Sequence, residues 1–429
     1  MAVSISDVRQ AAGTTFRSLG VRNFRLYFIG QFVSQAGTWM QMVALTWVVF
    51  TLTDSGVALG LVTAAQFLPV LILGAWGGVL ADRVDRRRFM LWAQIAFTVV
   101  AGIIAVLMVL DRLTVPWIYA LSVVLGVLTA VDNPTRRSLV GDLVEGDDVA
   151  NAVALHSAMM TGSRVFGPAI AGVLIGTVGV AWCFIINTVS YLVVIGALLL
   201  MDTSRIRPAP RVDRARGQLL DGLRYVWSQP NLRHTIVILA VIGTLAFEYQ
   251  VTLPLLAERT LDAGAGGFTM LYSAMSAGSV IGALAMARRA GVDLVFLRRA
   301  GWALAGATVA LSAAPNLAVA LVAVVFVGAA TISLVAGANA LIQLEADTRM
   351  RGRALALTTV VFLGSTPIGG PIAGAFSEWF GPRSGLLLGA VGAVAVVLWS
   401  SAHRSELAVA PTSSGAGSGP GSGSAAEAA

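Results

Sequence analysis

The sequence contains no lysine, one cysteine and three histidines. All 29 basic residues are arginine, so a P-loop lysine, a kinase-type lysine and a Schiff-base nucleophile are all excluded. ATP-driven transport encoded by this chain is therefore nearly excluded. The lone Cys183 rules out an intrachain disulfide, and no histidines share a metal-ligand spacing. We expect no metal, no cofactor and no enzymatic activity.

The chain also has few charged residues for its length. Of its 429 residues, 57% are hydrophobic and 12% are charged, whereas soluble domains carry roughly 25% charged residues. The mean hydropathy is +0.81, which indicates a polytopic membrane protein in contact with a lipid bilayer. The net charge of +7 does not indicate a nucleic-acid partner, because the arginines lie in short loops between apolar segments.

Twelve apolar segments are each close to the ~20 residues that a membrane helix needs. We expect an all-α fold with twelve membrane helices in two six-helix halves. The predicted spans are about 24–52, 57–80, 89–110, 115–138, 149–176, 181–201, 234–257, 267–288, 295–313, 316–344, 352–377 and 382–402. The predicted organisation is a cytoplasmic lead at 1–23, an N-terminal half at 24–201, a cytoplasmic linker at 202–233, a C-terminal half at 234–403 and a disordered tail at 404–429.

The distribution of arginine predicts the orientation. Residues 202–233 carry seven arginines, three aspartates and three prolines, and form the longest internal polar segment. If loops alternate sides, 25 arginines fall in the termini and even-numbered loops, and three fall in the odd-numbered loops. This asymmetry places both termini in the cytoplasm.

Two weak internal repeats support the division into halves. The segment 282–291, after the eighth span, is similar to the segment that starts at Gly78, 204 residues earlier. The segment 370–374 echoes 167–172 in the same way. A transporter with a central site between two repeats is expected to have equivalent helices, with similar motifs, in its two halves. Chance similarity between Gly/Ala-rich helices is the alternative.

The densest charge cluster before residue 200 lies at 78–88, between the second and third spans. We interpret it as a tight basic loop on the cytoplasmic side. It resembles the signature of the major facilitator superfamily at this place in the chain. The matching positions are Gly78, Leu80, Asp82, Arg83, Arg86, Arg87 and Arg88. Asp85 departs from the pattern, because the family usually has glycine there.

This resemblance implies a gate on the cytoplasmic side. Asp82 would contact the eleventh helix, and Asp132, at the end of the fourth span, could pair with Arg83; a solvated helix end is the alternative for Asp132. The family's usual arginine in the fourth span is absent, since Ser122 stands four residues before Gly126. Because this arginine is absent, the family's commonest scheme of proton coupling does not apply directly, and we look for the coupling residues among Glu248 and Arg164.

The fifth span contains a proline between regularly spaced glycines, which predicts a kinked helix with a smooth packing face. The segment 162–172 resembles the antiporter motif of drug-exporting major facilitators, with Ala171 in place of a glycine. By analogy it would help seal the outward side and favour export; an ordinary kinked helix is the alternative. The predicted gating residues are Gly78, Asp82, Arg83, Arg86, Arg87, Asp132, Gly167, Pro168 and Gly172.

Two charges stand out because they lie near the middle of predicted spans, where an isolated charge costs ~3 kcal/mol or more. They are Arg164 in the fifth span and Glu248 in the seventh. We expect Glu248 to bind the coupling proton or a cationic substrate. Arg164 would tune Glu248 or hold an anionic group of the substrate. A structural ion pair, or a glutamate near the outer rim, is the alternative.

A polar stripe at helical spacing runs along the first span and cannot favourably face lipid. The predicted cavity residues from this stripe are Gln31, Gln35, Trp39 and Gln41. Packing between helices is the alternative. Amide and aromatic groups suit a neutral or amphipathic organic solute.

Several stretches between residues 20 and 400 resemble the transmembrane secretion effector group, which includes enterobactin exporters and macrolide efflux proteins. They are residues 23–31, 66–69, 78–88, 132–134 and 163–168. The resemblance implies a monomeric multi-pass protein of the bacterial cytoplasmic (inner) membrane. It would export a siderophore, macrolide or other drug-like solute by proton antiport and alternating access. Proton-coupled uptake by symport and a non-transporting sensor or scaffold are the alternatives.

Overall fold

The computed structural model describes residues 16–146, 148–206, 218–289, 291–348 and 350–403. Over these ranges the chain is helical and has no strand. Two short 3-10 helices are η1 (Arg17–Gly20) and η2 (Thr203–Arg205). The α-helices are α2 (Arg22–Thr53), α3 (Gly56–Arg83), α4 (Arg86–Val109), α5 (Val115–Asp142), α6 (Asp148–Thr177), α7 (Ala181–Leu199), α8 (Gln218–Ser228), α9 (Pro230–Ala246), α10 (Tyr249–Arg259), α11 (Gly264–Ala287), α12 (Leu294–Ser312), α13 (Leu317–Glu345), α14 (Arg351–Trp379) and α15 (Ser384–Ala402).

Twelve segments of the described chain are long and apolar enough to cross a membrane. The second of these segments covers residues 56–74 of α3. The seventh runs from 230 to 259 and contains both α9 and α10. This confirms the predicted all-α fold with twelve spans. The predicted tail at 404–429, most of the predicted lead and the linker residues 207–217 lie outside the described residues.

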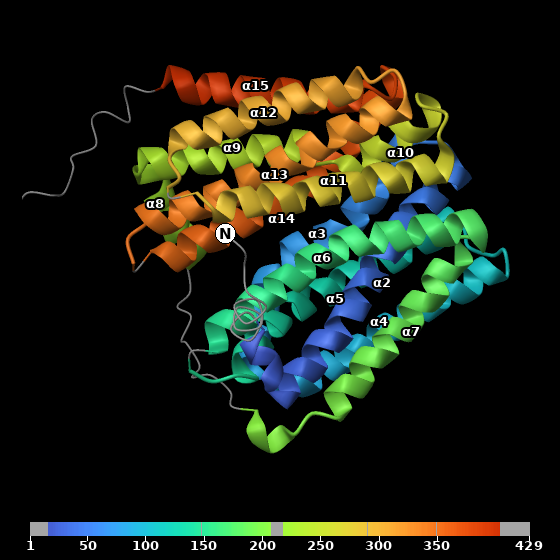
Figure 1. Ribbon diagram of the computed structural model, residues 1–429, viewed down its shortest axis with the longest axis vertical. Helices are drawn as coiled ribbons and strands as arrows, with labels where there is room; N and C mark the ends of the chain where they lie inside the picture. Colours follow the sequence, from blue (N-terminus) through green and yellow to red (C-terminus); the bar gives the residue numbers. More distant parts are fainter. Residues whose placement is uncertain (1–15, 147, 207–217, 290, 349, 404–429) are drawn as a thin grey trace, which may run out of the picture.

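The helices form two groups, α2–α7 and α8–α15 (Figure 1). The groups converge towards the right of the view, near α10, and diverge towards the left, near α8. Helices α3 and α6 of the first group pack against α14 and α11 of the second. We call the converging region the closed end.

Small residues let helix backbones approach closely, which in lipid replaces the hydrophobic driving force for association. One of the tightest described examples joins α11 and α13. A Cβ built on Gly278 would lie 2.0 Å from the carbonyl oxygen of Val325, and one on Gly328 would lie 1.9 Å from that of Met275. Only glycine fits at these two positions.

The predicted seventh span differs from the structure in being broken. Helix α9 ends at Ala246, and Glu248 has φ −84° and ψ 44°, outside the helical region, before α10 begins at Tyr249. The carbonyl of Glu248 accepts bonds from the backbone N–H and the hydroxyl of Thr252 at 3.0 and 3.1 Å. The new helix therefore starts from Glu248 itself.

The predicted polar linker also contains a helix, α8, and the next span begins at Pro230 rather than at residue 234. Proline suits the first turn of a helix, because the N–H that it lacks would have had no partner there. Helix α8 is followed by α9 after the single residue Gln229.

Candidate functional site

A polar latch joins the two helix groups at the closed end. The guanidinium of Arg259, at the end of α10, lies 3.0 Å (Nη2) and 3.2 Å (Nε) from Oδ1 of Asp54, after α2. The hydroxyl of Ser55 donates to Oε2 of Glu378 on α14 at 2.6 Å, and the backbone N–H of Val57 donates to the same oxygen at 3.0 Å. Because Asp54 is exposed, water screens the ion pair.

Beneath the latch, the backbones of α3 and α14 touch through glycines. A Cβ on Gly60 would lie 2.5 Å from the carbonyl oxygen of Gly370. A Cβ on Gly374 would lie 2.2 Å from that of Gly56. Contacts this short are impossible for any other residue, so closure at this end requires glycine at these positions.

The predicted gating residues of the fifth span have two different roles in packing. A Cβ on Gly167 would lie 2.5 Å from Cβ of Trp39, so this glycine brings α6 against α2 within one group. A Cβ on Gly172 would lie 2.5 Å from Oγ1 of Thr269, so this one brings α6 against α11 across the groups. Pro168 is buried within α6 between them.

The basic loop is short, because α3 ends at Arg83 and α4 begins at Arg86. Asp85, which occupies the family's usual glycine position, caps α4: its Oδ1 accepts from the backbone N–H of Arg88 at 2.9 Å. A carboxylate at this position also interacts favourably with the positive end of the helix dipole.

The two predicted gating arginines that follow are tied to neighbouring helices of the first group. Nη1 of Arg86 donates to both carboxylate oxygens of Asp142 on α5, each at 2.7 Å. Nε of Arg87 donates to the carbonyl of Leu198 on α7 at 2.8 Å. The remaining predicted gating positions of this loop are Gly78, Asp82 and Arg83. They belong to α3, but their surroundings lie outside what the structure describes.

Asp132 belongs to a buried polar cluster. It forms an ion pair with Arg136, one turn along α5, and accepts from Nε2 of Gln94 at 3.4 Å. With its amide oxygen turned towards Arg136, Gln35 accepts from Nη2 at 3.1 Å. The amide of Gln31 is buried and has no hydrogen-bond partner in the described structure. The predicted pairing of Asp132 with Arg83 stays a prediction.

The residues of the predicted polar stripe on α2 therefore have different neighbours in the structure: Gln35 lies beside Arg136 of α5, whereas Gln41 and Thr38 contact α7. Gln41 accepts from Nδ2 of Asn187 on α7 at 2.7 Å, and the hydroxyl of Thr38 lies 3.0 Å from that of Tyr191 on the same helix. These residues lie in the contact between α2 and α7. Trp39 instead is half-buried and faces α6.

Trp39 belongs to a set of side chains from both helix groups that we call the central cluster: Trp39, Met42, Arg164, Glu248, Gln250 and Tyr272. The guanidinium of Arg164 lies 4.8 Å from the centre of the Trp39 ring, a distance typical of a cation–π contact. Arg164 is exposed, and no ion pair joins it to Glu248 or to another carboxylate of the described chain. Tyr272 on α11 interacts electrostatically with both Arg164 and Glu248. The side chain of Gln250 contacts Met42, with Nε2 3.2 Å from Sδ.

Glu248 lies at the break between α9 and α10 with only 3% of its surface exposed. Its Oε1 is buried without a hydrogen-bond partner in the described structure. The carboxylate lies against α14, where a Cβ on Gly369 would be 2.7 Å from Oε1 and one on Gly370 3.5 Å from Oε2. Both charges of the central cluster were predictable from the sequence, whereas no sequence pattern indicated Tyr272, Gln250 or Met42.

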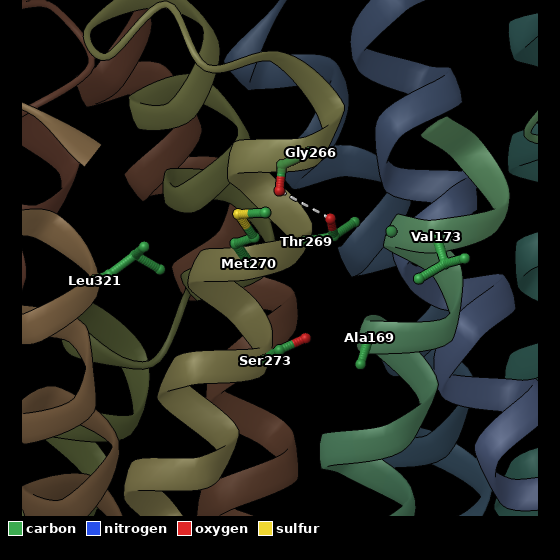
Figure 2. Close-up of a pocket in the computed structure, with 8 residues that line it drawn as sticks. Ala169, Val173, Gly266, Thr269, Met270, Ser273 and Leu321 are labelled. Carbon is green, nitrogen blue, oxygen red and sulfur yellow. Dashed lines mark hydrogen bonds between the residues drawn. The ribbon is translucent and has the colours of Figure 1, made fainter. Parts of the chain in front are cut away.

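A separate crevice of about 510 Å³ lies between α6 and α11 (Figure 2). Ala169 and Val173 of α6 lie opposite Thr269 and Ser273 of α11 across it. No charged residue lines it, so it can accommodate an apolar group but cannot bind a charge through a charged side chain.

The fold and the comparisons define the class of protein. A solved structure of the nucleoside transporter NupG is similar, with a TM-score of 0.72 at 12% identity, covering 89% of this chain and 98% of that one. A bacterial homologue of the human lysosomal transporter Spinster, in an inward-facing and occupied conformation, gives 0.71 at 14%, covering 90% and 97%. The chain therefore has the fold of a major facilitator.

The sequence comparisons narrow the class to one family. A model of the family described as "Transmembrane secretion effector" matches residues 13–414. The chain belongs to this family. It is 24% identical to the staphyloferrin A transporter of Staphylococcus aureus (strain NCTC 8325 / PS 47) over 61% of this chain and 66% of that protein. It is 28% identical to the enterobactin exporter EntS of Escherichia coli O1:K1 / APEC over 61% and 62%. The chain thus spans less than two thirds of the length of these relatives.

Proposed function

We propose that the protein is a secondary active transporter, not an enzyme, that exports a small organic solute in exchange for protons. The observation that carries this proposal is Glu248, a buried carboxylate at a helix break, without a partner for Oε1, beside groups from both halves. The names of the relatives favour a siderophore as the solute, and a macrolide or another drug-like compound is the wider class. The protein acts as a monomer in the bacterial inner membrane, with both termini in the cytoplasm.

In that orientation the closed end faces outwards, and the structure is an inward-facing conformation. Opening to the outside requires Arg259 to leave Asp54 and α3 to separate from α14. The ion pair is screened by water, and the contact between α3 and α14 is made by glycines without side chains. Both can therefore break and re-form within a transport cycle. The gating roles of Gly167, Pro168 and Gly172 in α6, and of Asp82, Arg83 and Asp132 at the opposite end, belong to the same proposal.

Glu248 is the proposed proton carrier. A charged carboxylate buried without a partner is costly, whereas the protonated form is neutral and can donate a hydrogen bond. Movement of α14 against α10 would change the surroundings of the carboxyl group and so its exposure to either side. This gives a route by which the conformational change and proton binding are linked.

Arg164 is the proposed anchor for a negatively charged group of the solute, with Trp39 supporting its guanidinium. This observation favours a second candidate function. An anion at Arg164 would attract a proton to nearby Glu248, so that solute and proton bind together. Such positive linkage is what proton-coupled uptake by symport requires.

Inverted membrane vesicles with an acid interior and a pH-sensitive dye distinguish these functions. Staphyloferrin A and enterobactin would be added outside as test solutes. Proton efflux after addition indicates antiport, and further acidification of the interior indicates symport. Absence of any proton movement, together with direct binding of the solute to the folded protein, would contradict both and indicate a non-transporting sensor.

The variant Glu248→Gln tests the proposed carrier. It keeps the size of the side chain and removes its charge, so we expect solute-driven proton movement to be lost while folded protein is retained. Glu345→Gln is the control, because it removes an exposed carboxylate at the end of α13 that already accepts a hydrogen bond from Asn231 at 2.9 Å, and it should behave like the wild type. Equal proton movement in both variants would exclude Glu248 as the carrier.

A further inference from the structure

Helix α8 has three distinct faces. Successive residues of an α-helix are rotated by about 100°, so positions i, i+3 and i+7 share a face. Leu220, Leu223 and Trp227 have this spacing and are exposed by 53%, 38% and 51%. The same helix exposes Arg224 and Ser228 on the neighbouring polar face.

The third face binds the rest of the protein. Val226 is fully buried, and a Cβ on Gly222 would lie 3.1 Å from Cβ of Arg353 on α14. The hydroxyl of Tyr225 accepts from the backbone N–H of Asp347, in the turn between α13 and α14, at 2.9 Å. These contacts fix the rotation of α8, so the exposed apolar face cannot turn inwards.

The position of α8 along the chain holds it close to the membrane surface. Only Gln229 separates it from α9, which is part of a membrane span. The surrounding segment 202–233 carries seven arginines against three aspartates. An apolar face beside a polar face, close to a span and within a basic segment, has the chemistry of a helix that lies in the interface of an anionic bilayer.

We propose that α8 is an interfacial anchor, with Leu220, Leu223 and Trp227 inserted between the lipids and Arg224 among anionic headgroups. Tryptophan favours this depth, because its ring is apolar and its indole N–H still reaches polar groups. The anchor attaches the end of the second helix group away from the latch to the bilayer surface. It does not depend on which solute is transported or on the direction of transport.

Site-directed spin labels in the full chain test this proposal. Leu223→Cys and Ser228→Cys lie on the apolar and polar faces of the same helix and are both exposed. Cys183 is fully buried, and the unsubstituted chain shows whether it takes up label. Each labelled protein is placed in nanodiscs of phosphatidylcholine, with or without phosphatidylglycerol. Collision with oxygen, which concentrates in lipid, is compared with collision with a water-soluble nickel chelate.

We expect the ratio of oxygen to nickel collisions to be about fivefold higher at position 223 than at position 228, and to fall when phosphatidylglycerol is removed. Leu220→Cys provides a second label on the apolar face and should follow position 223. Equal, high nickel access at both positions would place α8 in water and overturn the proposal. Low access to both reagents at positions 220 and 223 would also overturn it, since a second protein surface would then cover the face. A ratio that is unchanged without phosphatidylglycerol would overturn the role of the arginines.

Discussion

Replacing Gly60 by alanine should push the two helix groups apart at the closed end. The added Cβ would lie 2.5 Å from the carbonyl oxygen of Gly370 and 2.7 Å from Cα of Pro371. Both are backbone atoms of α14 and cannot move aside as the end of a side chain can. The conformation described above then persists only if α3 and α14 separate by roughly 1 Å.

The size of the effect follows from the cost of overpacking. An extra methyl group in a closely packed contact costs about 1–3 kcal/mol. If the protein alternates between closed and open states at this end, that cost lowers the population of the closed state relative to the open state by about 5- to 150-fold. The open state lacks the contact, so its free energy is unaffected.

Distances between spin labels measure this population. Leu52, at the end of α2, and Trp379, at the end of α14, are exposed residues on opposite sides of the closed end. Labels on cysteines at these positions should give a short distance in the parent protein. In the Gly60→Ala variant, a longer distance should dominate.

Gly74→Ala is the matched control. It lies on the same helix, its added Cβ would have no heavy atom of a neighbouring element within 4 Å, and it gains the same helix propensity of about 1 kcal/mol. Its distance distribution should match that of the parent. If Gly60→Ala also matched the parent, the contact between α3 and α14 could not be what holds this end closed.

Three further changes have expected outcomes. Arg259→Gln removes the ion pair with exposed Asp54, so it should lower the unfolding free energy in detergent by less than about 1 kcal/mol, and salt should reduce the difference. Gly328→Ala should lower the melting temperature clearly, at a cost of about 1–3 kcal/mol, while Gly306→Ala, with nothing near its Cβ, should not. Asn316→Ala removes the side-chain cap of α13 and should cost about 1 kcal/mol, measured by thermal unfolding against the parent.

The twelve spans could be predicted because the hydrocarbon thickness sets the helix length and lipid offers the backbone no hydrogen bonds. The break after α9 could not. No glycine or proline lies at positions 246–252, so nothing local requires the helix to stop at Glu248. Glu248 is accommodated at the break because α14 offers glycines at 369 and 370, which is a property of the tertiary arrangement.

The candidate site divides in the same way. Arg164 and Glu248 were predictable from the cost of a charge in a span, but not that they would lack a direct ion pair. The capping role of Asp85 could be predicted from the sequence, because aspartate is a preferred residue at the position before a helix. The latch between Asp54 and Arg259 could not be predicted, because two helix ends 205 residues apart meet only when the two halves pack together.

Helix α10 connects two places that transport would have to coordinate. It begins directly after Glu248 and includes Gln250 of the central cluster, and its last residue is Arg259 in the latch. Eleven residues of α-helix, with Pro254 among them, span about 16 Å, so a tilt of about 10° that the helix transmits along its whole length would move the far end by about 3 Å. That displacement is as long as the contact between Arg259 and Asp54. In the proposed transport cycle, helix α10 would act as a lever: a small rearrangement around the carboxyl group of Glu248 would be carried along the helix to the contact between Arg259 and Asp54.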